Sequence, residues 1–400
     1  MNRSKTGNNK FLKRYNETAV LDLIRVRKGM SRADISLATG LSPTATGMIV
    51  SGLMEKGYIY ETGTGESRGG RRPVMLELKP GSFFSAGVDI DTDYVNVILM
   101  DITGRIIGEK TEHAMISSNA GATARKIEDL VEEVLKNHGV HTDRLLGIGI
   151  SVPGMVDSET HRIVLAPNLG WENTDMASLL EGFPRVPVYL ENEAMASAIC
   201  ENWIGSCQGV DNFVCINIKS GIGAGIYTGG RLYRGSGGSA GEMGHIVVDE
   251  NGPLCGCGNY GCLETMASTT RIIEKVRKLV RQGVVSKLNG FQNLEEITIN
   301  DVIAAARSGD EAARGILTES ARYLGIAVSN IVNTLNPSKI VIGKEFVRYA
   351  DIVMDQVKSI VKCKALKSPA SKVEIAASEI GEKTSVIGAA IIPLKVLFGR

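Results

Sequence analysis

Three cysteines and one histidine come close together in the second half of this 400-residue chain. Cys255, Cys257 and Cys262 lie within eight residues, and His245 lies ten residues before the first of them. Thiolate and imidazole groups are the usual ligands of Zn²⁺, which binds four of them tetrahedrally in structural sites. Four protein ligands leave no position for an activated water. We therefore predict a structural zinc site, with cysteines that only pack in the core as the alternative.

The start of the chain and its apolar runs bear on the compartment. The first ten residues, MNRSKTGNNK, are polar and no apolar core follows them, so they do not form a secretory signal. No apolar run approaches the ~20 residues that span a bilayer. We expect a cytoplasmic protein with no membrane partner, in which thiols stay reduced and are available to bind metal.

Charge is distributed unevenly along the chain. Residues 1–80 carry 14 Lys and Arg against 7 Asp and Glu, whereas the remaining residues carry 31 against 37. A basic segment joined to an acidic body is typical of a protein whose first part meets a polyanion. The composition is otherwise that of a globular protein, with 43% hydrophobic and 22% charged residues, which excludes a disordered chain.

Three short helices are expected in the basic segment. Residues 16–28 carry apolar side chains at helical spacing. Ser31 with Asp34 forms a capping-box pattern for a second helix, and Ser42 with Pro43 provides the cap and first turn of a third. This layout indicates a helix-turn-helix that binds DNA, with a packing unit that has no nucleic-acid partner as the alternative. The buried stripe of the third helix is predicted to be Ala45, Ile49 and Leu53.

A candidate wing follows the three helices. Residues 58–62 and 74–78 are expected to be strands, and the glycine-rich segment between them carries Arg68, Arg71 and Arg72. Guanidinium groups on such a backbone reach phosphates or a narrow minor groove. The third helix has one lysine and no arginine, so bidentate base reading by arginine is not expected from it. Its predicted contacts with double-stranded DNA come from Ser42, Pro43, Thr44, Gly47, Met48 and Ser51.

From residue 83 onward, strands and helices alternate in two similar sets. This order predicts an α/β body of two related lobes, with ligands at the strand ends that line a cleft. The expected strands cover 84–90, 94–100, 105–111, 145–151, 187–192, 212–218, 223–228 and 339–343. The expected helices cover 122–137, 193–203, 263–282, 310–335 and 346–361.

Eight segments together resemble one known family. They are SRADISLATGLSPTATGMIVSGLMEKGYI, RGGRRP, SVPGMVD, APNLGW, ENEA, SGIGAGI, GEMGH and CGCGNYGCLE. Over nearly the whole chain, the sequence resembles the ROK family of repressors, open reading frames and sugar kinases, and within it the xylose-repressor-like regulators. The resemblance implies an N-terminal winged helix-turn-helix at 1–80, followed by a two-lobed actin-like, ribonuclease-H-like sugar-kinase fold. Lobe I would cover 81–200 and be completed by a C-terminal helix at 382–400, and lobe II, with the zinc loop, would cover 201–381.

The same resemblance implies a sugar site. Asn192 of ENEA matches a family residue that binds sugar hydroxyls, and Glu193 stands where the kinases carry an aspartate as general base. The extra methylene of Glu193 would displace that carboxylate, an error that can cost ~10²-fold in rate. His245 of GEMGH would use one ring nitrogen for zinc and the other for a sugar hydroxyl. Short polar side chains of this kind suit sugars. The implied sugar ligands are Asn168, Asn192, Glu193, Glu242, His245 and Glu264.

The loops that bind nucleotide phosphates in the family's kinases are altered here. The kinases carry DIGGTK, whereas this chain has Asp89-Ile90-Asp91-Thr92-Asp93-Tyr94. Carboxylates repel phosphate, and Cβ atoms keep the backbone away from it. The family's glycine run near Ile342 is reduced to Gly343-Lys344-Glu345, although SGIG is nearly intact. We therefore expect a protein that binds sugar and is not an enzyme.

These observations lead to one function and two alternatives. The leading hypothesis is a sugar-responsive repressor of a carbohydrate-utilisation operon, which a bound monosaccharide, with a xylose-like sugar favoured, releases from operator DNA. An ATP-dependent sugar kinase with an appended DNA-binding domain is the first alternative, and a structural zinc protein without ligand is the second. Repressors of this layout read two half-sites, so a homodimer, or a tetramer, is expected.

Overall fold

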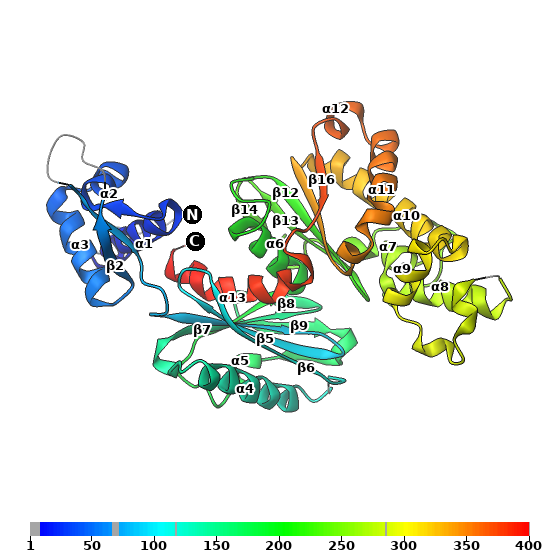
Figure 1. Ribbon diagram of the computed structural model, residues 1–400, viewed down its shortest axis with the longest axis horizontal. Helices are drawn as coiled ribbons and strands as arrows, with labels where there is room; N and C mark the ends of the chain where they lie inside the picture. Colours follow the sequence, from blue (N-terminus) through cyan, green and yellow to red (C-terminus); the bar gives the residue numbers. More distant parts are fainter. Residues whose placement is uncertain (1–8, 66–71, 117, 285, 400) are drawn as a thin grey trace. The chain divides into compact units, whose positions relative to one another are not determined.

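The structure is a computed structural model that describes residues 9–65, 72–116, 118–284 and 286–399 (Figure 1). The chain divides into two compact units. The first unit consists of residues 1–151, 159–190 and 389–400, and the second of residues 152–158 and 191–388. Among the described residues, none of the helices combines the length and apolar character needed to cross a membrane.

The first unit begins with three helices and a small antiparallel sheet. The helices are α1 (Asn9–Arg27), α2 (Arg32–Thr39) and α3 (Pro43–Glu55), and the strands β1 (Met30–Ser31), β2 (Ile59–Thr64) and β3 (Val74–Leu78) pair in the order β1-β3-β2. The predicted caps are present: Ser31 and Asp34 form a complete capping box on α2, and the Ser42 hydroxyl accepts the Ala45 N–H at the start of α3. These bonds satisfy backbone donors that a helix start otherwise leaves unpaired.

The predicted buried stripe of α3 is right at Leu53 and wrong by one position at its other two residues. Thr46, Val50 and Leu53 are the buried residues, whereas Ala45 and Ile49 are only half-buried. A shift by one residue turns the buried face of a helix by about 100°. The sequence of α3 permits either face, because small or apolar residues occupy both sets of positions. The packing of α3 on α1 and α2 selects the stripe through Val50, and it buries the Thr46 hydroxyl without a hydrogen-bond partner among the described residues.

A five-stranded sheet forms the centre of the rest of the first unit. Its order is β11-β7-β4-β5-β6, with β4 antiparallel to β5 and parallel to β7. Helices α4 and α5 lie along one face and α13 along the other (Figure 1). A side chain at Gly149 of β7 would collide with the Ala389 carbonyl of α13, so the glycine permits the close approach of this helix. The bounds are β4 (Phe84–Ile90), β5 (Tyr94–Asp101), β6 (Ile106–His113), α4 (Ala120–Asn137), β7 (Leu145–Val152), α5 (Met176–Leu179), β11 (Val188–Asn192) and α13 (Thr384–Leu397).

The second unit repeats this sheet topology. Its sheet has the order β14-β13-β12-β15-β16, with β12 antiparallel to β13 and parallel to β15, so each sheet consists of an antiparallel meander followed by two further strands. The predicted pair of related α/β lobes is therefore confirmed. The strands are β12 (Phe213–Ile218), β13 (Ile222–Thr228), β14 (Arg231–Tyr233), β15 (Lys339–Lys344) and β16 (Glu374–Ala377). The helices are α6 (Glu193–Trp203), α7 (Leu263–Ala267), α8 (Thr269–Arg281), α9 (Ile299–Arg307), α10 (Glu311–Leu335), α11 (Ala350–Lys364) and α12 (Lys367–Ala370).

One predicted helix is in fact two. The segment 263–282 is divided into α7 and α8 at Ser268, which has an extended backbone and whose hydroxyl accepts the Arg271 N–H. Serine at such a position favours a new helix start over continuation, because its side chain replaces a missing backbone acceptor. The helix expected at 346–361 begins later, at Ala350, after the short 3₁₀ helix η6 (Glu345–Arg348).

Candidate functional site

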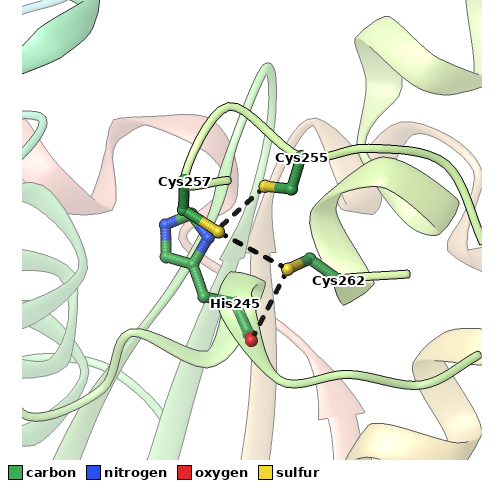
Figure 2. A group of neighbouring side chains, drawn as sticks. All are labelled: His245, Cys255, Cys257 and Cys262. Atoms are coloured by element: carbon green, nitrogen blue, oxygen red, sulfur yellow. Dashed lines mark hydrogen bonds between the residues drawn. The ribbon is translucent and has the colours of Figure 1, made fainter. Parts of the chain in front are cut away.

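The four predicted metal ligands form one cluster in the second unit. His245 ends the 3₁₀ helix η3 (Met243–His245), Cys255 and Cys257 lie in the following loop, and Cys262 directly precedes α7. One ligand atom from each residue lies within 4.8 Å of all the others (Figure 2). The sequence prediction that these residues come together is therefore confirmed.

Distances within the cluster fit a tetrahedral zinc ion. The Cys257 and Cys262 sulfurs are 3.7 Å apart, and the Cys255 sulfur is 3.6 Å from Nδ1 of His245. Zn–S bonds of ~2.3 Å and Zn–N bonds of ~2.0 Å at tetrahedral angles require about 3.8 Å and 3.6 Å for these two distances. Because Nδ1 of His245 lies 3.6 Å from the Cys255 sulfur, Nε2 is the nitrogen left for a second partner.

The loop that carries the cysteines is shaped by its backbone. The Gly261 carbonyl accepts the Val248 N–H, and the Asn259 carbonyl accepts the Cys255 N–H. Gly261 has a φ of +64°, and a side chain there would collide with the Asp249 carbonyl, so glycine is required at this position. The Asp249 carboxylate in turn accepts the hydroxyl hydrogen of Tyr323 on α10, at 2.9 Å.

The three thiols differ in acidity. The backbone N–H of Asn259 is the main cause that lowers the pKa of Cys257 to about 7. Burial raises the pKa of Cys262 to about 12 and that of Cys255 above its ordinary value. Cys257 is therefore the thiol that ionises first, and a bound metal has to displace protons from the other two.

Three of the predicted sugar ligands adjoin this cluster. Burial raises the pKa of Glu242, with His245 acting in the opposite direction and the Glu264 charge adding to the increase. Glu242, His245 and Glu264 are therefore electrostatic neighbours within the second unit. Glu264, the second residue of α7, also accepts the Ile222 N–H at 3.2 Å, which fixes its carboxylate beside the glycine-rich SGIG segment.

Asn192 and Glu193 lie at the start of α6 in the same unit. The Asn192 side-chain oxygen accepts the Ala194 and Met195 N–H groups, and its Nδ2 donates to the Gly154 carbonyl at 2.9 Å. This leaves one Nδ2 hydrogen without a partner among the described residues. Glu193 is half-buried in the first turn of the helix.

Asn168 lies in the other unit. It belongs to the 3₁₀ helix η2 (Pro167–Leu169) and is exposed. Its predicted contact with a sugar stays a prediction.

The predicted DNA-contact residues on α3 are mostly exposed. Pro43, Thr44 and Ser51 are exposed, as are the cap Ser42 and Met48, whereas Gly47 is half-buried. Of the wing arginines, Arg72 is exposed, and Arg68 and Arg71 lie outside the described residues. Contact with DNA stays a prediction for all of them.

Carboxylates at the end of β4 and in the turn after it are held by local hydrogen bonds. Asp91, in the turn between β4 and β5, is buried and accepts the Thr92 N–H at 2.7 Å. Asp89, in β4, accepts hydroxyl hydrogens from Ser151 at 2.6 Å and from Tyr94 at 2.8 Å. The loss of nucleotide binding that the sequence predicts for this segment stays a prediction.

Lys344 has an unusual backbone for its residue type. Its φ is 57° and its ψ is −141°, a region that favours glycine, and its side chain is buried. Its Nζ donates to the Ser385 hydroxyl at the start of α13, at 2.5 Å. A lysine side chain therefore fills space at the end of β15.

Sequence reasoning missed one prominent contact near the site. Arg234 and the buried Glu191 form an ion pair with two hydrogen bonds, of 2.8 and 2.5 Å. They are 43 residues apart, and no local pattern joins them. The one available signal was a glutamate at the end of an apolar strand, because a buried carboxylate requires a partner.

Comparisons with known proteins agree with this arrangement. The ROK family model matches residues 85–396. The xylose repressor of Caldicellulosiruptor bescii is 33% identical over 96% of this chain and 96% of its own length. A crystal structure of a ROK family transcriptional regulator, a homologue of the Escherichia coli MLC protein, covers 97% of both chains with a TM-score of 0.84 and 29% identity. A ROK family glucokinase from Streptomyces griseus, in complex with glucose and AMPPNP, covers 77% of this chain and 98% of its own, with a TM-score of 0.69 and 28% identity. A family match over most of the chain, together with a full-length relative above 30% identity, shows that the protein belongs to the ROK family.

Proposed function

We propose that this protein is a transcriptional repressor that binds operator DNA through its N-terminal helices and wing and is released by a monosaccharide. The observation that carries the proposal is the grouping of Glu242 with both His245 and Glu264, in which Nδ1 of His245 lies 3.6 Å from the Cys255 sulfur of the cysteine cluster. Hydrogen-bonding groups in one half-buried place suit sugar hydroxyls. Likeness to a xylose repressor over nearly the full length of both chains supports a xylose-like effector and the control of a carbohydrate-utilisation operon.

A structural zinc ion would hold His245 in place. With Nδ1 on the metal the ring would be unable to rotate, and Nε2–H would be left to donate to a hydroxyl of the sugar. Asn192, Glu193 and Asn168 would complete the set of hydroxyl partners. The zinc supplies no reaction here, because four protein ligands fill its coordination sphere.

The effector would act by shifting a population of conformations. A sugar releases DNA only if it binds the DNA-incompetent state more tightly, typically by 1–3 kcal/mol of coupling. We expect the protein to act in the cytoplasm as a homodimer, or a tetramer, that binds two half-sites of operator DNA. The DNA-binding domain would be residues 1–80, lobe I residues 81–200 with 382–400, and lobe II residues 201–381.

An active sugar kinase is the second candidate, because the glucokinase with glucose and AMPPNP shares the fold at 28% identity. Against it stands the sequence of the first phosphate loop, where Asp91 and Thr92 replace the two glycines of the kinase segment and the Asp91 side chain is buried. A carboxylate repels an anionic phosphate, and Cβ atoms keep the backbone away from it.

Two measurements on the full-length protein test these candidates. Calorimetric titration with xylose, glucose and N-acetylglucosamine, followed by fluorescence anisotropy on labelled operator DNA, should find one sugar that binds and lowers DNA affinity. A coupled assay with ATP and the same sugars should find no ADP release. Turnover at ordinary kinase rates, ~1–100 per second, would favour the kinase.

A further inference from the structure

Glu191 and Arg234 form a doubly hydrogen-bonded ion pair near the proposed sugar site, in which the carboxylate is buried and the arginine is partly exposed. Glu191 is the next-to-last residue of β11 and its side chain is 2% exposed, whereas Arg234 follows β14 directly. Nη1 and Nη2 of the arginine donate to the two carboxylate oxygens at 2.8 and 2.5 Å. This paired geometry fixes both distance and orientation, which a single ionic contact does not.

At one end, the pair is attached to the start of α6. Oε1 of Glu191 also accepts the backbone N–H of Asn192, at 3.1 Å. The Asn192 side chain caps α6, and Glu193 is the first residue of that helix. The orientation of the Glu191 carboxylate is therefore transmitted to both residues of the proposed site on α6.

At the other end, the pair fixes the beginning of a glycine-rich loop. Residues 234–241 read RGSGGSAG and lead directly into Glu242. Four glycines give such a loop many conformations when it is free, so its ordering has a high entropic cost. The loop is closed by the Ala240 N–H, which donates to the Arg234 carbonyl at 3.1 Å, and its end is held on β13 by the Ala224 N–H, which donates to the Gly241 carbonyl at 2.8 Å.

We propose that the Glu191–Arg234 pair is a positioning device for effector binding. It holds the residues on α6, Asn192 and Glu193, in register with those that follow the loop, Glu242 and His245. This inference rests on the proposed function in taking a sugar as the effector. Buried ion pairs contribute little net stability, because desolvation offsets their attraction. The fixed distance and orientation of the Glu191–Arg234 pair therefore explain its presence better than a gain in stability does.

The test compares Arg234→Lys with a matched control, Arg348→Lys. Lysine keeps the charge but forms only one hydrogen bond at a time. Arg348 pairs with Glu382 in the same unit through two hydrogen bonds, donated by Nε and Nη2, and Arg348 and Arg234 are similarly exposed, at 32% and 35%. Hydrogen exchange of residues 235–242 should become at least tenfold faster in Arg234→Lys and stay within twofold of wild type in Arg348→Lys, with one zinc per chain in both.

Sugar affinity provides the functional readout. We expect Arg234→Lys and Glu191→Gln each to weaken binding of the best sugar at least tenfold, while Arg348→Lys changes it less than twofold. The double variant Glu191→Gln/Arg234→Lys should lose no more than the worse single variant, because both act through one pair. Losses that multiply in the double variant, or an equal loss in Arg348→Lys, would overturn the proposal.

The two measurements separate this inference from the proposed function. If wild-type protein binds none of the sugars, the proposed function fails, and loop exchange in the metal-loaded protein still decides whether the pair positions the loop. If wild-type protein binds a sugar but loop exchange in Arg234→Lys matches wild type, the positioning role is wrong and the repressor proposal stands.

Discussion

Glu242 is half-buried and has two ionisable neighbours, the Glu264 carboxyl group and the His245 ring. Burial raises its pKa, His245 acts in the opposite direction, and the Glu264 charge adds to the increase. A carboxyl group that has lost water on burial gains from a hydrogen bond, and a sugar hydroxyl can supply one.

Replacing Glu242 by Ala should reduce sugar affinity by about 1–3 kcal/mol, because a buried hydroxyl would lose its partner. DNA binding without sugar should be unchanged, so the variant would be a repressor that does not release. Calorimetry and operator anisotropy measure the two effects. Glu250→Ala, at an exposed glutamate of the following loop, is the control. Equal losses in both variants would argue against a specific contact.

Cys257 to Ser should remove both the zinc and the sugar response. Serine is a poor zinc ligand, and without the metal the His245 ring is free to rotate away from the sugar. Metal analysis under reducing, chelator-free conditions and sugar titration should show the two losses together. Cys363→Ser, at an exposed cysteine outside the cluster, should change neither. Wild-type protein without zinc would refute the metal proposal.

Zinc affinity should rise steeply with pH above neutrality. Cys257, with a pKa of about 7, is ionised at pH 7.5, whereas burial keeps Cys255 and Cys262 protonated there. Zinc binding then releases two protons, so affinity should increase about a hundredfold per pH unit between pH 7.5 and 8.5. Competition with a chelator of known affinity measures this slope. A slope near zero would mean that the buried thiols do not bind the metal.

At the scale of single elements, helix starts were predictable where a side chain caps the backbone. Asn192 caps α6, and the predicted and observed bounds of that helix coincide at 193–203. Ser268 caps α8 in the same way, yet 263–282 was predicted as one helix, because a serine inside an apolar periodic pattern also fits a helix interior. Caps are local, whereas the choice between a cap and a continuous helix is made by tertiary packing.

The contacts of the candidate site also fall into two groups, those made between residues close in sequence and those made by the tertiary fold. The metal ligands were predictable because three of them lie within eight residues, so that a single loop is enough to bring their side chains together. The Glu191–Arg234 pair was not, since Glu191 lies in β11 and Arg234 follows β14, and these strands belong to different sheets that only the tertiary fold brings together. The stripe of α3 was missed for a similar reason, because α1 and α2 determine which face is covered.

The wing is the element in which DNA affinity should be concentrated, because α3 has no arginine. Arg71→Ala should weaken operator binding and reduce the slope of log affinity against log salt by about one. Anisotropy titrations between 50 and 200 mM salt provide the slope, because counterion release changes DNA affinity strongly over this range. Lys79→Ala removes the same charge at an exposed position after the wing and should leave the slope unchanged. A larger change of the salt slope in Lys79→Ala than in Arg71→Ala would show that the main DNA contacts lie outside the wing.

At the scale of the whole molecule, the two sheets share one strand order, and α13 contains the boundary between the two units, at Gly388. A side chain at Gly388 would collide with the Ala196 carbonyl of α6, and one at Gly149 with Ala389. Gly149 and Gly388 therefore permit close packing of α13, each within its own unit.

Sugar and operator should weaken each other by the same factor. A coupling of about 1–3 kcal/mol means that sugar lowers operator affinity about 5–150-fold. Operator DNA must then lower sugar affinity by the same factor, because both effects belong to one thermodynamic cycle. Calorimetric sugar titrations with and without a saturating operator duplex measure one side, and anisotropy measures the other. Unequal factors would show that a further equilibrium, such as a change of oligomeric state, is involved.

The backbone at Lys344 has a consequence for substitutions at this position. A backbone with φ of 57° and ψ of −141° costs a residue with a Cβ about 1–3 kcal/mol and costs glycine almost nothing. A residue of this type keeps such a backbone only where its surroundings hold it, and the hydrogen bond from Nζ to Ser385 is one such contact. A glycine at this position would relieve the strain and lose that bond.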